Sequence, residues 1–455
     1  MLADAPNPRG GTWGQGDVIA FVASPYTGLV RVSAAGGAVE LLTRPEPGEN
    51  HEHPRFLPSG RTVLMVAQPR SLQGEIEAVN LETGARKTLV KDADSPAYLA
   101  SGHLVYNQAG TLFAAPFDPI GLEVTGPAVA ITDDVQVAPA QYDVSIDGAL
   151  VYVPGRSLGQ GALVSVDREG SERPITSELR AYFGPRLSPD GKRVAVTIFD
   201  EMRNSSVWVY ELSRDSLTRL PFDNGRTNSP LWSPDGRSIA FSVVVPQYQL
   251  VLAPADGSRP AESLTEPSGY LIFANSWAPD GRGLVYLTFN PSTGSDLWTL
   301  SLDDGVRKAI PWLSSNFDER GAEISPDGRF LAYLSDESGQ YEVYVQAFPG
   351  QGAKWKISTN GGTEVCWARS GRELFYREDD KMMAVRIETR PEFSASKPSV
   401  LFTGYRTSNP GFRFYDVFPD GEHFLMVRGE ESPSSTELAL IQNWSGEVER
   451  MAPSR

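Results

Sequence analysis

Short runs of alternating apolar and polar residues recur along the whole chain and predict β-strands. The clearest copies follow a Ser-Pro-Asp-Gly turn, as in WSPDGRSIAF from Trp232 and ISPDGRFLAY from Ile324. In such a turn Pro presets φ, Asp bonds nearby backbone and Gly supplies the positive φ that closes it. The aspartates of the motif are therefore expected to form turns rather than to act in catalysis: Asp190, Asp235, Asp280, Asp327 and Asp420.

The turn recurs with a regular period, which predicts the architecture. Complete and degenerate copies place turn glycines at Gly16, Gly60, Gly102, Gly148, Gly191, Gly236, Gly281, Gly328, Gly371 and Gly421. The nine intervals between them span 405 residues and average 45. Each period holds four short strands, and four antiparallel strands in about 45 residues is typical of a β-propeller blade. We expect an all-β protein of about ten blades with almost no helix.

Ten blades exceed the roughly four to eight of one propeller, so two rings are expected. The sequence predicts an incomplete N-terminal propeller over residues 1–147, with about three or four blades. A C-terminal propeller over residues 148–455 would hold about six or seven blades. The regular copies from Gly191 to Gly421 would form six of these, with Gly148 closing that ring or ending the first. The start of the chain reads like the tail of a strand, so we expect it to begin inside a longer protein.

Charge and composition narrow the function further. The chain has 41 basic and 57 acidic residues and a net charge of −16, which repels nucleic acid and anionic membranes. A single cysteine, Cys366, excludes an intrachain disulfide and is expected to be a buried apolar side chain. No segment has the apolar length of a membrane helix or a signal peptide, so this chain is not expected to insert into a membrane. These features leave the cellular compartment of the protein open.

Common catalytic motifs are missing from the sequence. The four histidines, His51, His53, His103 and His423, exclude the H-R-D loop of a kinase, and no G-x-S-x-G elbow of a serine hydrolase occurs. His51 and His53 flank Glu52, but two ligands do not complete a metal site, and a solvated loop between blades is expected there. The sequence predicts no metal and no cofactor.

Several longer stretches carry a family resemblance. They are PNPRGGTWGQGDVIAF, NQAGTLFAAPFDPIGLEVTG, the segment from Phe317 to Tyr376, and YDVFPDGEHFLM. The repeat resembles the TolB-like, PD40-type (WD40-like) propeller. The whole chain is similar to the propeller that follows the kinase and membrane helix in many bacterial receptor-type serine/threonine kinases. The resemblance implies a sensor or scaffold region, extracytoplasmic in such a kinase, and carries no kinase activity onto this chain. WARSG departs from the arginine-and-aspartate form of that turn, and the blades next to the kinase are absent.

Loops that enter the innermost strand of each blade gather around the channel mouth of a propeller, so they are the predicted contact surface for a protein or small-molecule ligand. Here these loops are polar and mixed in charge. Their candidate rim residues are Asp223, Asn224, Arg226, Asn228, Asp318, Glu319, Arg320, Glu364 and Arg413. Arg320 is expected to lie in a loop, where its replacement would leave the melting temperature unchanged.

Three readings of this surface remain open. The first is the sensor region of a receptor-like kinase, and the second is a free periplasmic TolB-like scaffold. The third is a propeller hydrolase or lyase that uses channel carboxylates such as Glu319 and Glu364. For each rim residue, an ordinary solvated turn is the alternative to a binding role, and a structural repeat with no ligand is the alternative for the whole chain.

Overall fold

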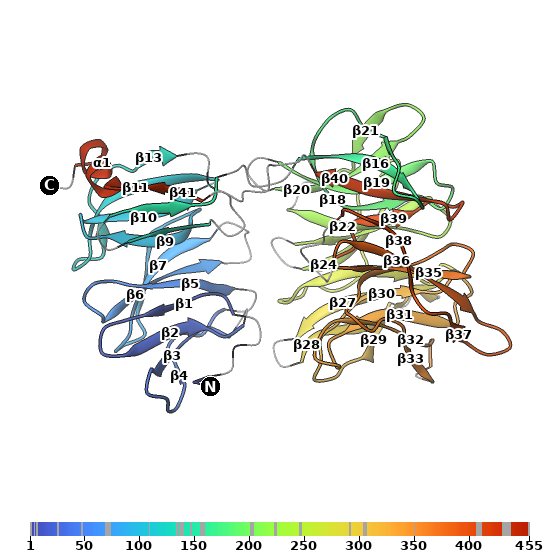
Figure 1. The fold of residues 1–455 in the computed structure, drawn as a ribbon, viewed down its shortest axis with the longest axis horizontal. Helices are drawn as coiled ribbons and strands as arrows, with labels where there is room; N and C mark the ends of the chain where they lie inside the picture. Colours follow the sequence, from blue (N-terminus) through green and yellow to red (C-terminus); the bar gives the residue numbers. More distant parts are fainter. Residues whose placement is uncertain are drawn as a thin grey trace. The chain divides into compact units, whose positions relative to one another are not determined.

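The structure is a computed structural model. It describes residues 2–3, 5, 8–24, 27–46, 49–68, 74–108, 110–132, 135, 141–145, 148–154, 160–200, 204–222, 225–244, 248–290, 293–303, 307–350, 352–405, 412–429 and 438–453. Their strands form ten antiparallel sheets (Figure 1). The predicted all-β propeller fold is confirmed, with the Ser-Pro-Asp-Gly turns joining the first two strands of each blade.

The chain divides into two compact units. Unit 1 is Met1–Gly159 with Glu431–Arg455, and unit 2 is Gln160–Glu430. The sequence prediction gave all residues after 147 to the second propeller. The difference arises because β41 (Ala439–Ile441) pairs with β15 (Leu150–Tyr152), which returns the end of the chain to unit 1.

Unit 1 holds four sheets. The first is β1 (Gly11–Trp13), β2 (Val18–Val22), β3 (Leu29–Ser33) and β4 (Glu40–Leu41), and the second is β5 (Asn50–Phe56), β6 (Thr62–Gln68), β7 (Glu75–Asn80) and β8 (Arg86–Val90). The third is β9 (Asp94–Leu99), β10 (His103–Gln108), β11 (Thr111–Asp118), β12 (Glu123–Val124) and β13 (Val129–Thr132). The fourth joins β14 (Tyr142–Val144) and β15 to β41, followed by the eight-residue helix α1 (Trp444–Met451).

Unit 2 holds six sheets. The closing sheet joins β16 (Gly161–Asp167) and β17 (Glu172–Pro174) to β39 (Tyr415–Val417) and β40 (His423–Gly429). Next come β18 (Ala181–Leu187), β19 (Arg193–Phe199), β20 (Ser205–Glu211) and β21 (Ser216–Arg219), then β22 (Thr227–Trp232), β23 (Ser238–Val243), β24 (Gln249–Pro254) and β25 (Glu262–Ser263). The fourth is β26 (Ile272–Trp277), β27 (Gly283–Asn290), β28 (Gly294–Ser301) and β29 (Lys308–Leu313). The fifth is β30 (Glu319–Ile324), β31 (Phe330–Ser335), β32 (Glu342–Ala347) and β33 (Lys354–Lys356). The last is β34 (Thr363–Trp367), β35 (Glu373–Glu378), β36 (Lys381–Glu388), β37 (Ser394–Ala395) and β38 (Ser399–Thr403).

Unit 2 closes into a ring. Its innermost strands contact one another in the order β18, β22, β26, β30, β34 and β39, and β39 returns to β18. The seam is the closing sheet, in which β16 pairs with β40 along seven residues, from Gly161 opposite Gly429 to Asp167 opposite His423 (Figure 1). Strands from both ends of the unit therefore share one blade, which protects the sheet edges that an open ring would expose.

The turn motif works as the sequence predicts. In the turns at Asp190, Asp235 and Asp327, the aspartate Oδ1 accepts bonds from the serine hydroxyl two residues before it and from the backbone N–H two residues after it. The following glycines have φ between 68° and 74°, as at Gly236 and Gly328. These aspartates therefore form turns, and their carboxylates are occupied by local hydrogen bonds.

The apolar core lies between successive blades. One cluster packs Val343 and Val345 of β32 against Trp367 and Leu374 of the next blade, and each of these side chains is nearly or fully buried. At the seam, Leu163 and Leu425 pack on Tyr182 in the same way. Burial of these faces needs both neighbours, so each blade depends on the next. Within the described ranges, no helical segment has the length and apolarity to cross a bilayer.

Candidate functional site in the channel of unit 2

The innermost strands of unit 2 carry a repeated irregularity. In β18, β22, β30 and β34 one extra residue is inserted opposite the neighbouring strand, a β-bulge. The residue at the bulge has a positive φ of 54° to 58°: Gly184, Ser229, Gly321 and Glu364. Bulges re-aim the side chains that follow them and are common beside binding sites. Two of these bulge residues, Ser229 and Gly321, line the cavity that the innermost strands enclose.

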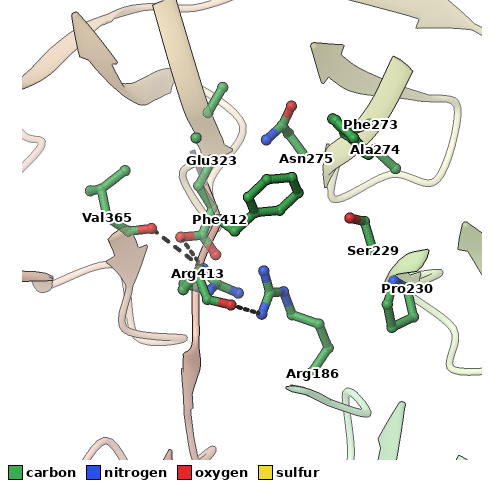
Figure 2. A pocket seen from close by; sticks show the side chains of 12 residues that line it. Arg186, Ser229, Pro230, Phe273, Ala274, Asn275, Glu323, Val365, Phe412 and Arg413 are labelled. Carbon is green, nitrogen blue, oxygen red and sulfur yellow. Dashed lines mark hydrogen bonds and ion pairs between the residues drawn. The ribbon is translucent and has the colours of Figure 1, made fainter. Parts of the chain in front are cut away.

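A small polar cavity lies where these strands converge (Figure 2). Its volume is about 40 Å³, room for a few water molecules. Arg186 and Arg413 contribute guanidinium groups and Glu323 a carboxylate. The rest of the lining is Ser229, Pro230, Phe273, Ala274, Asn275, Gly321, Ala322, Val365 and Phe412.

Aromatic rings pack beside the cavity. The Phe412 ring lies 5.1 Å from that of Phe183 and 5.0 Å from that of Phe273, centroid to centroid, in edge-to-face arrangements. Phe183 also contacts Phe414 at 4.8 Å. The side chains of β18 and β26 are thus linked across the channel by the residue that precedes Arg413.

Arg413 connects two carboxylates in the channel wall. Its Nη1 lies 2.8 Å from Oε2 of Glu323 and its Nη2 lies 3.2 Å from Oδ1 of Asp416. The two carboxylates also accept backbone N–H groups: Glu323 from Trp367 at 2.8 Å, and Asp416 from Leu187 at 2.7 Å. Both carboxylates are therefore held in place by bonds within the protein, and they share Arg413 as their direct ion-pair partner among the described residues.

Arg186 lies beside this network without a carboxylate of its own. Its Nη1 donates to the carbonyl oxygens of Pro185 and Arg413, at 2.8 and 2.9 Å. No ion pair joins it to a carboxylate among the described residues. Burial, together with the positive charge of Arg413, lowers the pKa of Arg186 to about 10. The side chain is still a cation at neutral pH.

Cys366 occupies the same layer and is 1% exposed. Its Sγ lies 3.9 Å from Oε1 of Glu323 and 3.8 Å from Oδ1 of Asp416. Burial raises the pKa of the thiol well above its usual value. The prediction of a buried cysteine is confirmed, and the thiol stays protonated.

The predicted rim residues of the β22 segment divide into three groups. Asp223 and Asn224 lie outside the described residues. Arg226 is 9% exposed and engaged in interactions. Asn228 lies on β22 beside the bulge at Ser229, and its buried Oδ1 has no partner among the described residues.

The β30 segment corrects the prediction for Arg320. It lies on a strand rather than in a loop, because β30 begins at Glu319. Its Nε and Nη2 bond Oδ1 and Oδ2 of Asp318 at 2.7 and 2.5 Å. Asp318 also accepts the Tyr341 hydroxyl at 3.0 Å. The predicted free donor is thus part of an internal brace.

Glu319 is buried, with 1% of its surface exposed. Its Oε1 accepts the Ser315 hydroxyl at 2.5 Å, while its Oε2 has no partner among the described residues. Burial raises the pKa of Glu319 to about 7, and the carboxylates of Asp296, Asp318 and Asp336 add to the effect. The carboxyl group is therefore about half protonated at neutral pH.

Glu364 and Arg413 hold the neighbouring strands together. Oε2 of Glu364 accepts the backbone N–H of Phe414 at 2.7 Å, and its carbonyl accepts the Tyr415 hydroxyl at 2.8 Å. Among the predicted rim residues that the structure describes, Arg413 is the one that lines the cavity.

Sequence reasoning missed Arg186, Ser229, Asn275 and Glu323. A signal for two of them was present: Arg186 and Glu323 each stand directly before the apolar residue that opens the turn motif, as do Cys366 and Asp416. Aligning the repeats at that position would have placed these four side chains in one layer of the ring.

Unit 1 contains a second polar cavity of about 260 Å³. It is lined by Gly10, Gly11, His53, Pro54, Arg55, Ser95, Pro96, Ala97, Tyr142 and Asp143. The solvated loop predicted for His51 to His53 is wrong: these residues lie on β5, and His51 is fully buried with its Nδ1 2.7 Å from Oγ1 of Thr43. Among the described residues, no group of three or more His, Cys, Asp or Glu could hold a metal ion.

Comparison with known proteins shows similarity to one class of protein. No family model matches the chain. An uncharacterised protein of Agrobacterium fabrum is 23% identical over 293 residues, which cover 60% of this chain and 94% of that protein. The Tol-Pal system protein TolB of Francisella tularensis is 24% identical over 200 residues, 43% of this chain and 45% of TolB. The chain is thus similar to TolB-like propellers.

Two further similar proteins are a peptidase and a protein of known structure. An uncharacterised peptidase, YuxL of Bacillus subtilis, is 25% identical over 229 residues, 48% of this chain and 32% of the peptidase. The solved structure of a putative TolB from Agrobacterium tumefaciens has 19% identity and a TM-score of 0.49, and it covers 59% of this chain and 98% of that one. This chain spans less than half the length of the TolB and peptidase relatives, so their activities are not transferred with the likeness.

Proposed function

We propose that this chain is a non-catalytic binding module, a TolB-like propeller scaffold that docks a protein partner at the channel of unit 2. The observation that carries the proposal is the convergence of six blades on one polar cavity that holds buried, unpartnered polar atoms. Oγ of Ser229, Oδ1 of Asn275 and Nε of Arg413 have no partner among the described residues. Buried polar atoms of this kind are costly unless something satisfies them.

The finer role is the sensor region of a receptor-type serine/threonine kinase. It is supported by the resemblance of the segment from Phe317 to Tyr376 to the propellers of such kinases. The gene sequence upstream of Met1 tests it. A kinase and a membrane helix there would support the sensor role, and a signal peptide without a kinase would support a free periplasmic scaffold instead.

The enzymatic alternative depends on Glu319 and Glu364. Glu319 is 1% exposed, and the carboxylate of Glu364 is bonded to the backbone of Phe414, so neither is free to meet a substrate. We expect no turnover in assays for ATP hydrolysis, peptide hydrolysis or glycan cleavage. Robust turnover that is lost in Glu319→Gln would contradict a non-catalytic role.

A matched pair of variants tests the docking surface. Ala274 lines the cavity on β26, and Ala309 is exposed on β29, the outermost strand of the same blade. In Ala274→Trp the indole would fill the channel, whereas in Ala309→Trp it would lie on the rim of the ring. Proteins captured from an extract of the source organism should be retained by Ala309→Trp and lost by Ala274→Trp. Equal capture by both variants would place the partner elsewhere.

A further inference from the structure

The cavity of unit 2 has an excess of hydrogen-bond donors, and Arg186 is the first of them. A guanidinium group carries five N–H donors, and the two on Nη1 serve the carbonyl oxygens of Pro185 and Arg413. The donors on Nε and Nη2 have no partner among the described residues. The two backbone carbonyls hold the Nη1 end of Arg186, and the N–H groups of Nε and Nη2 remain available to a ligand.

The acidic groups nearby favour the charge of Arg186 only through space, because their direct ion pairs go to Arg413. Glu323 and Asp416 both bond Arg413, and each accepts a further backbone N–H, from Trp367 and Leu187. Two carboxylates thus serve one arginine with good geometry. Arg186 is left without a direct ion pair among the described residues, although the two arginines and two carboxylates of the cluster balance in charge.

Further polar groups point into the same space. The hydroxyl of Ser229 and the Nε–H of Arg413 are buried donors without a partner among the described residues, whereas the unpartnered atom of Asn275 is Oδ1, an acceptor. Figure 2 shows Arg186, Ser229 and Asn275 around the ring of Phe412, with Arg186 bonded to the carbonyl of Arg413. Three different blades therefore supply groups able to donate to a single anionic group.

We propose that this cavity binds a carboxylate group of the docked protein, either an acidic side chain or the C-terminal carboxylate. The inference rests on the proposed docking function and names the chemistry that the channel recognises. A planar carboxylate suits the fork of a guanidinium group. Phosphate is disfavoured because the cavity is only about 40 Å³ and phosphate is the bulkier anion.

Small anions test the site without the partner. We would titrate the protein with formate, acetate and orthophosphate at constant ionic strength and follow binding by saturation-transfer NMR, or by phosphorus line width for phosphate. Formate and acetate should bind to the wild type, and Arg186→Met should weaken that binding at least about tenfold. Arg193→Met is the matched control, because Arg193 bonds the carbonyl of Gly236 outside the cavity lining.

A milder variant keeps the test valid if Arg186→Met does not fold. Ser229→Ala removes one hydroxyl donor and should weaken formate binding severalfold. Formate binding that is equal in the wild type, Arg186→Met and Ser229→Ala would overturn the proposal, as would tighter binding of orthophosphate through Arg186.

The outcomes separate this inference from the proposed function. If Ala274→Trp loses the captured partner but no carboxylate binds at Arg186, docking stands and the carboxylate site falls. If formate binding depends on Arg186 while Ala274→Trp still captures the partner, the anion site stands and the docking surface falls.

Discussion

The buried carboxyl group of Glu319 predicts an unusual dependence of stability on pH. The pKa of Glu319 is raised from 4.5 to about 7, chiefly by burial. Between these two values the unfolded chain releases a proton that the folded chain keeps, so stability falls as pH rises. A shift of this size corresponds to about 3 kcal/mol of unfolding free energy, lost between about pH 4.5 and pH 7.

Glu319→Gln removes this titration while keeping a neutral group of similar shape. At pH 5 the variant and the wild type should unfold with similar free energies. By pH 8 the variant should be more stable by up to about 3 kcal/mol, because the wild type must then hold a buried charge. Because the other ionisable groups are the same in both proteins, the difference between them isolates Glu319.

Glu342 supplies a matched control in the same blade. It is also 1% exposed, but on β32 its carboxylate accepts bonds from Ser358 and Gln340 and pairs with Lys356 at 3.2 Å. Burial alone would raise its pKa, yet these bonds outweigh burial and lower it. Glu342→Gln should therefore destabilise the protein at neutral pH, and the loss should shrink as pH falls below about 4.5.

Urea unfolding at steps from below pH 4.5 up to pH 8, followed by tryptophan fluorescence, measures both variants. Scanning calorimetry assigns the affected transition to unit 2. A difference between Glu319→Gln and the wild type that stays flat across this range would refute the reasoning, because it would mean that Glu319 titrates alike in the folded and unfolded chain.

Two further predictions concern single contacts. Arg320→Ala should lower the unfolding free energy of unit 2 by about 1–3 kcal/mol, because both of its bonds to Asp318 are lost, whereas the exposed Arg282→Ala should change it little in the same urea titration. An unchanged urea midpoint for Arg320→Ala would show that its bonds to Asp318 do not stabilise the fold, so Arg320 would again be a candidate for binding a partner. Trp444→Ala should destabilise unit 1 by about 3–5 kcal/mol, since this side chain of α1 is 1% exposed in the cluster with Leu99 and Leu150. Met451→Ala on the same helix should cost far less by calorimetry, and equal effects would contradict the assigned packing.

The fold was predictable because the turn chemistry repeats. Positive φ at Gly236 and Gly328, and the local bonds of Asp235 and Asp327, are fixed by four adjacent residues, so the sequence alone exposes them. The return of β41 to unit 1 was not predictable in this way. It depends on pairing with β15, nearly 300 residues earlier, and its three residues carry no turn motif.

The site was predicted less well because its residues lie on strands rather than in the polar loops. Arg320 and Glu319 look like loop residues by composition, yet β30 buries Glu319 and pairs Arg320 with Asp318. Conversely, Arg186 follows Pro185 within the otherwise largely apolar run from Ala181 to Leu187. The bulge at Gly184, formed only in the folded sheet, precedes it in the strand that faces the channel.

Arg186 differs chemically from residues at the same position in other blades, directly before the apolar residue that opens the turn motif. In three blades the side chain at this position accepts the backbone N–H of the next blade: Ser276 from Ile324, Glu323 from Trp367, and Asp416 from Leu187. This contact joins neighbouring blades, so an acceptor there is explained by structure alone. A guanidinium group has no acceptor and cannot make the bond.

Two other blades also lack that bond, but the residue at this position in them carries no charge. The equivalent Leu231 and Cys366 are uncharged, so their burial needs no counter-ion. Arg186 lacks the structural bond and buries a cation that no carboxylate among the described residues pairs with directly, which is unfavourable. Where one blade breaks, at an energetic cost, a contact that other blades keep, a functional position is expected. The same comparison that explains Glu323 and Asp416 as structural therefore leaves Arg186 as the residue of this layer whose charge the contact between blades does not explain.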